Sequence, residues 1–284
     1  MGHVYFARHR RLGRPAAVKV LRPDRGDSRN AQARFLREVQ TLGQLAHPNV
    51  IHAYDAGVAG RTYFLAMEDA YGPDLGQMLG GGPVPFPQAC EYARQAALGL
   101  HHLHERGLVH RDVKPSNLRL GDDGRVVKLL DIGLVRDRDA EQSGNAHRLT
   151  QPGWVVGTMD YTSPEQVTDS REAGPAADQY GLGATLFHLL TGDVPFPGGT
   201  PVAKAVQKAT ADAPPVTDRR PDLPAGLAAV VSRMLSRDPD HRYPSAQAAA
   251  DALALFAAPL PKGAPAGALG FVPSPTLPPD DTDV

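Results

Sequence analysis

Acidic, basic and amide side chains are concentrated between His110 and Asn117, where the sequence reads His-Arg-Asp-Val-Lys-Pro-Ser-Asn. The triplet Asp131-Ile132-Gly133 begins fourteen residues after Asn117. Carboxylate and amide oxygens are hard ligands that suit Mg²⁺, an ion that keeps several waters and bridges nucleotide phosphates. The side chains of Asn117 and Asp131 therefore carry oxygen donors of the kind that suits this ion.

A lysine and a glutamate occupy positions where an unpaired charge would be costly. Lys19 lies between two valines in a short β-rich stretch, and Glu38 falls on the apolar face of a predicted helix. Burying a charge without a partner is strongly unfavourable, whereas a buried pair of opposite charges is tolerated. We therefore expect Lys19 and Glu38 to form an ion pair between a sheet and a helix.

The order and spacing of these motifs resemble those of bacterial, eukaryotic-like (Hanks-type) serine/threonine protein kinases. The stretch from His110 to Asn117 is similar to the catalytic loop of that family, and Asp131-Ile132-Gly133 is similar to its magnesium-binding loop. The resemblance runs from the first residues to about Ala257 and includes three further motifs, Ser163-Pro164-Glu165, Asp178–Gly183 and Asp238–Tyr243. It implies an α+β protein of two lobes, with a small antiparallel sheet and one helix in the first lobe and mainly helices in the second.

The resemblance implies a role for each charged residue in phosphoryl transfer, which depends on positioning and charge neutralisation. Lys19, held by Glu38, would grip the α- and β-phosphates of ATP. Asn117 and Asp131 would bind Mg²⁺. The implied cofactors are therefore ATP and Mg²⁺.

The catalytic loop also indicates which hydroxyl group is phosphorylated. The resemblance implies that Asp112 orients the acceptor hydroxyl and that Lys114 lies beside the transferred phosphate. A lysine two residues after the aspartate, together with Thr158 after Gly157, resembles the serine/threonine pattern, because tyrosine kinases place an arginine differently in this loop. We expect transfer to serine or threonine of other proteins or of the chain's own activation loop.

The same resemblance implies which residues surround the adenine and the ribose. Val4 and Ala17 would cover the adenine from above, Met67 would be the gatekeeper, and Glu68 to Ala70 would form the hinge. Asp74 would reach the ribose, and Arg119 would lie at the floor of the adenine site. Arg119 stands where an apolar side chain usually forms the floor of the adenine site. Its guanidinium can stack on a flat ring, although a charge in a dry pocket is costly.

The start of the chain departs from the family pattern. The opening Met-Gly-His-Val-Tyr matches only the last glycine, here Gly2, and the valine and tyrosine of the loop that covers the phosphates. We expect the first strand and two glycines of that loop to be missing. Their loss would weaken the backbone's approach to the phosphates and leave a sheet edge unpaired.

Two alternatives to an active protein kinase stay open. The first is a pseudokinase or regulatory scaffold with weak or no catalysis, because the nucleotide loop is incomplete. The second is a small-molecule phosphotransferase of related architecture. The long segment from Asp131 to Glu165 favours a protein kinase over the second alternative, because it looks suited to docking a peptide.

Regulatory residues are predicted around the activation loop. Arg111 precedes the catalytic aspartate, and an arginine there is placed to bind a phosphate from the segment between Asp131 and Glu165. Thr150, eight residues before Thr158, is the preferred phosphorylation site, with Ser143 second. A solvated loop without regulation is the alternative.

Composition limits the partners. Thirty basic and thirty-one acidic residues give a net charge of -1, so no bulk attraction to nucleic acid is expected. The single cysteine, Cys90, excludes an internal disulfide and is interpreted as core packing. The sequence has neither an apolar run long enough to span a membrane nor a secretory signal, so a cytoplasmic location is expected. The expected partners are protein substrates in signal transduction, and a homodimer is left open.

Hydrophobic periodicity divides the chain into three regions. Residues 1–69 form an N-terminal lobe of strands with one helix, 70–257 a mainly helical lobe, and 258–284 a proline-rich disordered tail. The predicted strands are Pro15–Leu21, Val50–Tyr54, Thr62–Glu68, Leu118–Leu120 and Val126–Leu129. The predicted helices are Asp27–Ala46, Pro87–Gly107, Pro175–Thr191 and Leu223–Arg237.

Several charged residues have structural interpretations. Glu165 and Arg242 are expected to form an ion pair, Asp178 to hold the catalytic loop through backbone N–H groups, and the basic run at residues 8–11 to be a solvated hairpin turn. Four histidines at helical spacing invite a zinc site, but no cysteine or second ligand pair accompanies them. Structural roles are therefore favoured for His101, His102, His104 and His110.

Overall fold

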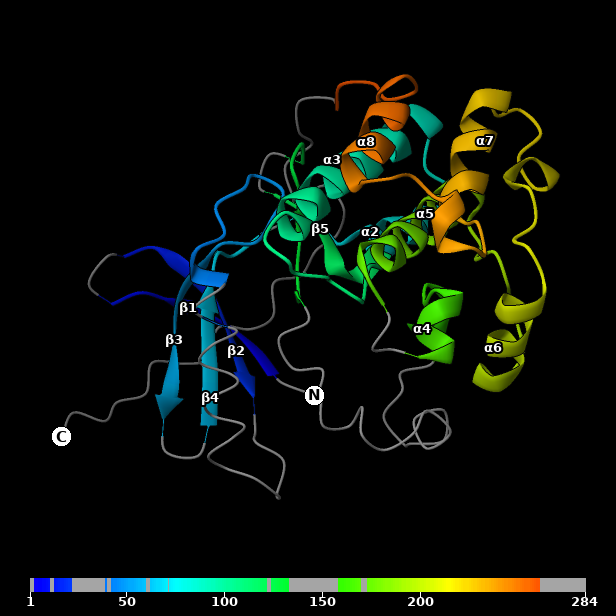
Figure 1. Cartoon of the computed structure of the whole chain (residues 1–284). Coiled ribbons are helices and arrows are strands. Elements are labelled where there is room, and N and C mark those ends of the chain that lie inside the picture. Colours follow the sequence, from blue (N-terminus) through cyan, green and yellow to red (C-terminus); the bar gives the residue numbers. More distant parts are fainter. Residues whose placement is uncertain are drawn as a thin grey trace.

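The computed structural model has a sheet at one end and a group of helices at the other (Figure 1). It describes residues 3–10, 13–21, 39, 42–59, 62–70, 72–121, 124–132, 158–169 and 173–260. The predicted α+β fold, with a small antiparallel sheet and a larger helical lobe, is confirmed. The lobe boundary near residue 70 stays a prediction.

The sheet has four antiparallel strands in the order β1-β2-β4-β3. Their bounds are β1 His3–Arg8, β2 Pro15–Leu21, β3 Ala53–Ala59 and β4 Thr62–Met67. Strand β2 has the predicted bounds, and β4 ends one residue before the predicted end. Its alternating half-buried and buried residues fit a strand with one face on the core.

Strand β1 lies at an edge of this sheet, where it pairs with β2. All six of its residues are exposed, including the large apolar side chains of Val4, Tyr5 and Phe6. Arg8 is the last residue of β1, and the backbone of His9 then hydrogen-bonds to Gly13 and Arg14 at the start of the return toward β2. Arg11 of the predicted basic turn lies outside the described residues.

The prediction for the third strand was wrong at both ends, because β3 starts later than Val50 and continues past Tyr54 to Ala59. Val50 and Ile51 were expected to open a strand, but β3 begins at Ala53. Val50 instead forms an isolated parallel bridge with Leu129, and the Ile51 N–H donates to the Leu129 carbonyl. Both apolar side chains are buried, which explains why the sequence pattern resembled a strand.

The helical lobe contains seven α-helices in the described part of the chain. They are α2 Leu75–Met78, α3 Phe86–His104, α4 Pro164–Thr168, α5 Pro175–Thr191, α6 Pro201–Thr210, α7 Ala225–Met234 and α8 Ala246–Ala254. The prediction of α5 was correct at both ends. The prediction of α3 began one residue late and ended three residues too far, and that of α7 began two residues early and ended three residues too far. Proline at the first turn of α4, α5 and α6 marks their starts.

Helix α5 forms the centre of this lobe. Its residues from Ala177 to Phe187 are all buried, as expected for a helix that is apolar on every side. Helix α3 packs against both α5 and α8 (Figure 1). Cys90 of α3 is fully buried, and burial raises the pKa of its thiol to about 12. The predicted packing role of this cysteine is confirmed.

A short hairpin connects the helical lobe to the active-site loops. Strands β5 Leu118–Leu120 and β6 Val127–Leu129 pair antiparallel, and β5 follows directly on the catalytic loop. Leu118 and Leu120 are buried while Arg119 faces the other way. The side chain of Asn49 donates to Gln95 and to the Val127 carbonyl, so the hairpin is fixed to α3.

Parts of three predictions lie outside the described residues. These are most of the helix predicted from residue 27 to 46, the activation loop from 133 to 157, and the tail from 261 onward. Among the described residues, no helix is both long and apolar enough to cross a membrane.

Candidate active site

The loop from His110 to Asn117 is held by one buried carboxylate. Asp178, in the first turn of α5, accepts hydrogen bonds from the backbone N–H groups of His110 (2.8 Å) and Arg111 (2.7 Å). Its Oδ2 also lies 2.8 Å from Nε2 of His104. A carboxylate that is 1% exposed is tolerated because its oxygens are hydrogen-bonded. The predicted role of Asp178 is confirmed.

The buried ring of His110 connects this loop to the magnesium-loop motif. Nε2 lies 2.7 Å from the Leu130 carbonyl, and Nδ1 lies 3.3 Å from the backbone nitrogen of Asp112. A carbonyl only accepts, so Nε2 donates to Leu130, while Nδ1 accepts from the Asp112 N–H. The N–H of Leu130 donates to the Asn117 carbonyl at 2.9 Å. These bonds bring Asn117 close to Asp131, the residue after Leu130.

The side chain of Asp112 contacts the ammonium of Lys114 and the side-chain amide of Asn117. Lys114 Nζ is 3.0 Å from Asp112 Oδ2, and Asn117 Nδ2 is 3.1 Å from the same oxygen and 2.7 Å from the Asp112 carbonyl. Because both bonds of Asn117 use its amide nitrogen, the amide oxygen is the atom that suits a metal ion. The side chains of Asp112 and Lys114 are 22% and 19% exposed, so a substrate can reach them.

Two residues of this region adopt a left-handed backbone conformation. Arg111 has φ 63° and Asp131 has φ 53°, and no other non-glycine residue in the described part of the chain has positive φ. Such conformations cost about 1 to 3 kcal/mol each for residues with a side chain, and surrounding contacts must hold them. The Arg111 N–H to Asp178 and the Gln166 amide to the Arg111 carbonyl are two such contacts.

Lys19 of β2 forms an ion pair with Asp131. Nζ lies 2.7 Å from Asp131 Oδ1, and the two side chains are 21% and 46% exposed. The contact joins the sheet to the loop that follows β6. Glu38, the predicted partner of Lys19, lies outside the described residues, so that prediction stays untested.

The predicted roof and gatekeeper of the adenine site are neighbours in the sheet. Ala17 pairs with Met67 across β2 and β4, and both are buried. Val4 of β1, the other roof residue, is half exposed and pairs with Lys19. Ala70, at the end of the predicted hinge, is buried.

Glu68 begins the predicted hinge, and both its side chain and its backbone N–H have partners. Its carboxylate lies 2.8 Å from Lys128 Nζ of β6. Its N–H donates to the His52 carbonyl at 2.8 Å. The carbonyl oxygen is therefore the group of Glu68 to consider for contact with a base.

Arg119 and Asp74, predicted for the floor and the ribose, form a β-bridge with each other. Arg119 Nε donates to the Gly72 carbonyl at 2.6 Å, so its guanidinium has a hydrogen-bond partner. Asp74 is the N-cap of α2, and its Oδ1 accepts from the Gln77 N–H at 2.9 Å. One oxygen of Asp74 therefore has a structural role.

Residues 158–163, called here the acceptor segment, lead into α4 beside the catalytic loop. Thr158–Asp160 form one turn of 3₁₀ helix, and Ser163 caps α4. The side-chain amide of Gln166 then donates to the Arg111 carbonyl at 3.0 Å. A pocket lined by Asp112, Tyr161, Thr162 and other residues lies between the loop and this segment.

The predicted ion pair after this segment is confirmed. Arg242 Nη1 and Nη2 lie 2.6 and 2.8 Å from the two carboxylate oxygens of Glu165. Arg242 is 2% exposed and also donates to the carbonyls of Ala176 and Ser236. This bidentate pair fixes α4 to the loop before α8.

The structure describes most, but not all, of the predicted site. Gly2, Glu38 and Thr150 lie outside the described residues. Sequence reasoning missed Gln166, which holds the catalytic loop, and Lys208, a buried lysine of α6 that contacts the acceptor segment. A glutamine three residues after Ser163 signals a capping box, which could have predicted part of the role of Gln166.

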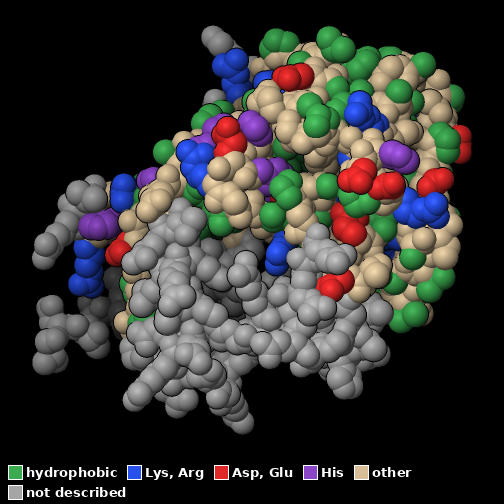
Figure 2. All heavy atoms as spheres, in the orientation of Figure 1, with side chains coloured by type: hydrophobic (Ala, Val, Ile, Leu, Met, Phe, Trp, Pro, Cys, Tyr) green, Lys and Arg blue, Asp and Glu red, His purple; other side chains and the backbone are tan. Residues whose placement is uncertain are grey.

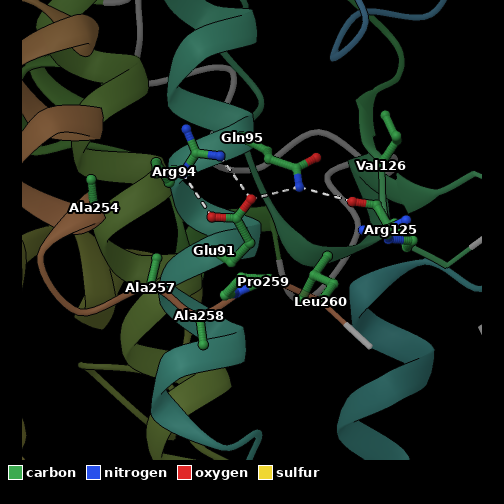
Figure 3. Close-up of a pocket in the computed structure, with 10 residues that line it drawn as sticks. All are labelled: Glu91, Arg94, Gln95, Arg125, Val126, Ala254, Ala257, Ala258, Pro259 and Leu260. Atoms are coloured by element: carbon green, nitrogen blue, oxygen red, sulfur yellow. Dashed lines mark hydrogen bonds and ion pairs between the residues drawn. The ribbon is translucent and has the colours of Figure 1, made fainter. Parts of the chain in front are cut away.

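Charge on the helical lobe is mixed. On the face drawn in Figure 2, acidic and basic side chains are interspersed over the described residues, without a large area of one sign. A second cavity, of about 530 Å³, lies among α3, the β5–β6 hairpin and the segment after α8 (Figure 3). Arg94 and Gln95 both donate to the carboxylate of Glu91 on its wall. None of the predicted site residues lines it.

Known proteins share this fold and these motifs. The model of the protein kinase domain matches residues 1–253. The chain is 37% identical to the serine/threonine-protein kinase PknB of Mycobacterium leprae over 252 residues, which is 87% of this chain and 39% of that protein. It is 37% identical to PknF of Mycobacterium tuberculosis over 249 residues, or 86% of this chain and 51% of PknF. The chain therefore spans two fifths to half the length of these relatives.

A solved structure agrees with these sequence relatives. The kinase domain of Mycobacterium tuberculosis PknI superposes with a TM-score of 0.67 and 29% identity, covering 90% of this chain and 91% of that one. Fold, site and relatives define the class: this chain belongs to the protein kinase family. Within that family it is a member of the bacterial Hanks-type serine/threonine kinases.

Proposed function

We propose that this chain transfers the γ-phosphate of ATP to serine or threonine side chains of proteins, using Mg²⁺. The observation that carries the proposal is the meeting of two groups of residues from different lobes. Lys19 of the sheet pairs with Asp131, and Asp131 follows the residue that hydrogen-bonds to the loop of Asp112, Lys114 and Asn117. A cation for phosphates, oxygen ligands for a metal and an orienting carboxylate are thus close together.

The nucleotide phosphates would meet Lys19 on one side and the metal ligands on the other. The donor chemistry fits Mg²⁺, because Asp131 supplies a carboxylate that is 46% exposed and Asn117 an amide oxygen. When bound, the ion would neutralise charge on the phosphates and on the departing diphosphate. Two protein ligands suffice for an ion that keeps waters and bridges phosphates.

In the proposed reaction the acceptor hydroxyl oxygen attacks the γ-phosphorus. The bond from that phosphorus to the bridging oxygen of ADP breaks, and the hydroxyl proton passes to Asp112. Asp112 is oriented for this by Asn117, and the adjacent ammonium of Lys114 would stabilise the negative charge on the transferred group. Lys114 in this position supports a serine or threonine acceptor, as in the named relatives.

We propose that residues Met67 to Ala70, at the end of β4 and in the predicted hinge, recognise the adenine. The buried Ala17 and Met67 would form an apolar roof and back wall, with Val4 in front. Because the Glu68 N–H already donates to His52, the Glu68 carbonyl and the backbone of Ala70 are the proposed contacts to the base. Asp74 would reach the ribose with the oxygen that does not cap α2.

Regulation is proposed through the activation loop. The backbone of Arg111 is fixed at its N–H by Asp178 and at its carbonyl by Gln166, so its side chain starts from a defined point beside Asp112. A phosphate on Thr150 would pair with this guanidinium and order the loop. Autophosphorylation at Thr150 and a contact from Thr158 to the catalytic loop are parts of this proposal.

Transfer of radiolabelled phosphate tests the proposal. The chain is incubated with Mg²⁺ and γ-labelled ATP, with a generic protein acceptor, and the label is located by phosphoamino-acid analysis. We expect phosphoserine or phosphothreonine, and at least about a 100-fold lower rate for Asp112→Asn. Asp218→Asn, an aspartate in an exposed turn, is the matched control and should retain the rate.

A separate binding measurement distinguishes the scaffold alternative from the kinase. Mg-ATP should raise the melting temperature of the wild type and of Asp112→Asn alike, because Asp112 acts on the acceptor. Equal labelling of wild type and Asp112→Asn would contradict the assignment. Stabilisation by Mg-ATP without any transfer would favour the scaffold.

A further inference from the structure

Helix α6 carries a lysine that has no exposed surface. Lys208 is 0% exposed, whereas the residues on either side of it, Gln207 and Ala209, are exposed, as are Val202 and Val206. Lysine is almost never fully buried unless its ammonium has partners, because burial removes water from the charge. The position therefore calls for a specific set of contacts.

The contacts of Lys208 are two backbone carbonyls of the acceptor segment. Nζ donates to the Asp160 carbonyl at 2.9 Å and to the Thr162 carbonyl at 2.7 Å. The same nitrogen lies 5.2 Å from the ring centre of Tyr180 in α5. The side chain of Lys208 thus binds two residues of the acceptor segment and packs against Tyr180 of α5.

The charges around Lys208 come from both elements that it joins. The Asp160 carboxylate faces the ammonium and is itself paired with Lys204, one turn earlier in α6. Burial lowers the pKa of Lys208 to about 7, the Asp160 carboxylate opposes that shift, and Lys204 adds to it. Charged or neutral, the amine has enough hydrogens for both carbonyls.

The segment held by Lys208 lies against the catalytic loop on its other side. A Cβ at Gly181 of α5 would be 2.9 Å from the Val113 carbonyl and 3.4 Å from the Tyr161 carbonyl, so both backbones cross α5 at the same point. The Tyr161 hydroxyl lies 2.7 Å from Nδ1 of His188. The position of Thr162 relative to the catalytic loop is therefore set by α5 from one side and by Lys208 from the other.

We propose that Lys208 is a positioning residue for the protein acceptor. By fixing the carbonyls of Asp160 and Thr162, it sets the acceptor segment at the distance from Asp112 that a bound peptide requires. This role rests on the proposed function. It concerns the acceptor rather than ATP, because the contacts of Lys208 lie on α5, α6 and the acceptor segment.

Steady-state kinetics test this role with Lys208→Met, which keeps the length of the side chain and removes its donors. We expect kcat/KM for a peptide acceptor to fall at least about tenfold, while KM for ATP stays within about twofold. Lys208→Gln, which retains a donating amide, should recover part of the loss. Gln207→Met, on the exposed side of the same helix, should behave as wild type.

Hydrogen exchange provides a readout that does not depend on phosphate transfer. In Lys208→Met the amides of residues 158–163 should exchange faster, while those of α3 keep their protection. If the wild type proves inactive, the proposed function fails, and this exchange measurement still decides whether Lys208 holds the acceptor segment in place.

Three outcomes would overturn the role of Lys208. The first is unchanged exchange in residues 158–163 of Lys208→Met. The second is a loss of activity that raises KM for ATP and for peptide equally, as a general structural defect would. The third is failure of both Lys208→Met and Lys208→Gln to fold, because the lysine would then be a folding residue.

Discussion

The catalytic loop and the acceptor segment are each held by one buried charge, and the two charges have opposite signs. Asp178 accepts from backbone N–H groups of the loop, and Lys208 donates to backbone carbonyls of the segment. Asp178 belongs to α5, which is buried on all sides, whereas α6 buries only Ala205 and Lys208. The loop is therefore fixed from the core of the lobe, and the segment from an element near its surface.

The largest effect on stability and activity should follow from replacing the buried carboxylate of Asp178. Asp178→Asn keeps the shape of the side chain but replaces an accepting oxygen with a donating NH₂, which would face an N–H group. An unsatisfied buried donor costs about 1 to 3 kcal/mol of stability. Misplacement of Asp112 should also lower kcat about 100-fold. Urea unfolding and phosphate transfer measure the two effects.

If Asp178→Asn lost stability but kept the wild-type rate of phosphate transfer, Asp178 would not be needed to position the catalytic loop. The loop would then hold its shape without the carboxylate. Asp218→Asn, at the surface, is again the control and should change neither quantity.

A smaller effect on stability and activity should follow from pushing the backbones of the catalytic loop and the acceptor segment away from α5 at Gly181. In Gly181→Ala the added Cβ would lie 2.9 Å from the Val113 carbonyl, which is a backbone atom and cannot rotate away. Overpacking of this kind costs about 1 to 3 kcal/mol. We expect lower thermal stability together with a lower transfer rate. Gly43→Ala, at a position with open space around the glycine, is the control.

If Gly181→Ala melted at the wild-type temperature and kept its rate, the close approach of loop and segment at α5 would not be needed. The two charges would then act independently.

The smallest effect is the pH dependence of stability from Lys208. Its pKa in the folded chain is about 7, below the ordinary 10.5, so between these values the unfolded chain binds the extra proton. Stability therefore rises with pH across this window and is lowest below pH 7, where the buried amine is charged. The limit is about 1.4 kcal/mol per pH unit for one proton.

Urea unfolding at pH 7.5 and pH 8.3 measures this difference. The wild type should gain about 1 kcal/mol more than Lys208→Met over that interval. Equal gains would show that Lys208 keeps its proton, held by the Asp160 carboxylate.

The sequence predicted one of these charges and missed the other, for a physical reason. Asp178 opens a recognisable motif, and the pair of Glu165 with Arg242 joins two motifs, so both were expected. Lys208 lies in a short helix with an ordinary mixture of lysine, alanine and valine. Its burial comes from packing against a segment distant in the chain, which periodicity within the helix does not report.

The same limit applies to other details. Val50 and Ile51 resembled a strand because burial against β6 demands apolar residues in an extended segment. The family, the fold and the grouping of Asp112, Lys114, Asn117 and Asp131 were predictable because spacing carries them. Roles for Gly2, Glu38, Thr150 and Thr158, a cytoplasmic location and a homodimer stay predictions.

The left-handed backbones of Arg111 and Asp131 also affect how this domain can be engineered. Glycine at either position would relieve conformational strain and raise the melting temperature, yet Asp131→Gly would remove a proposed metal ligand and Arg111→Gly the proposed partner of a regulatory phosphate. Selection for heat resistance alone would therefore favour substitutions that inactivate the enzyme. A useful library of stabilised variants would keep both positions constant and seek its gains in helices far from the catalytic loop.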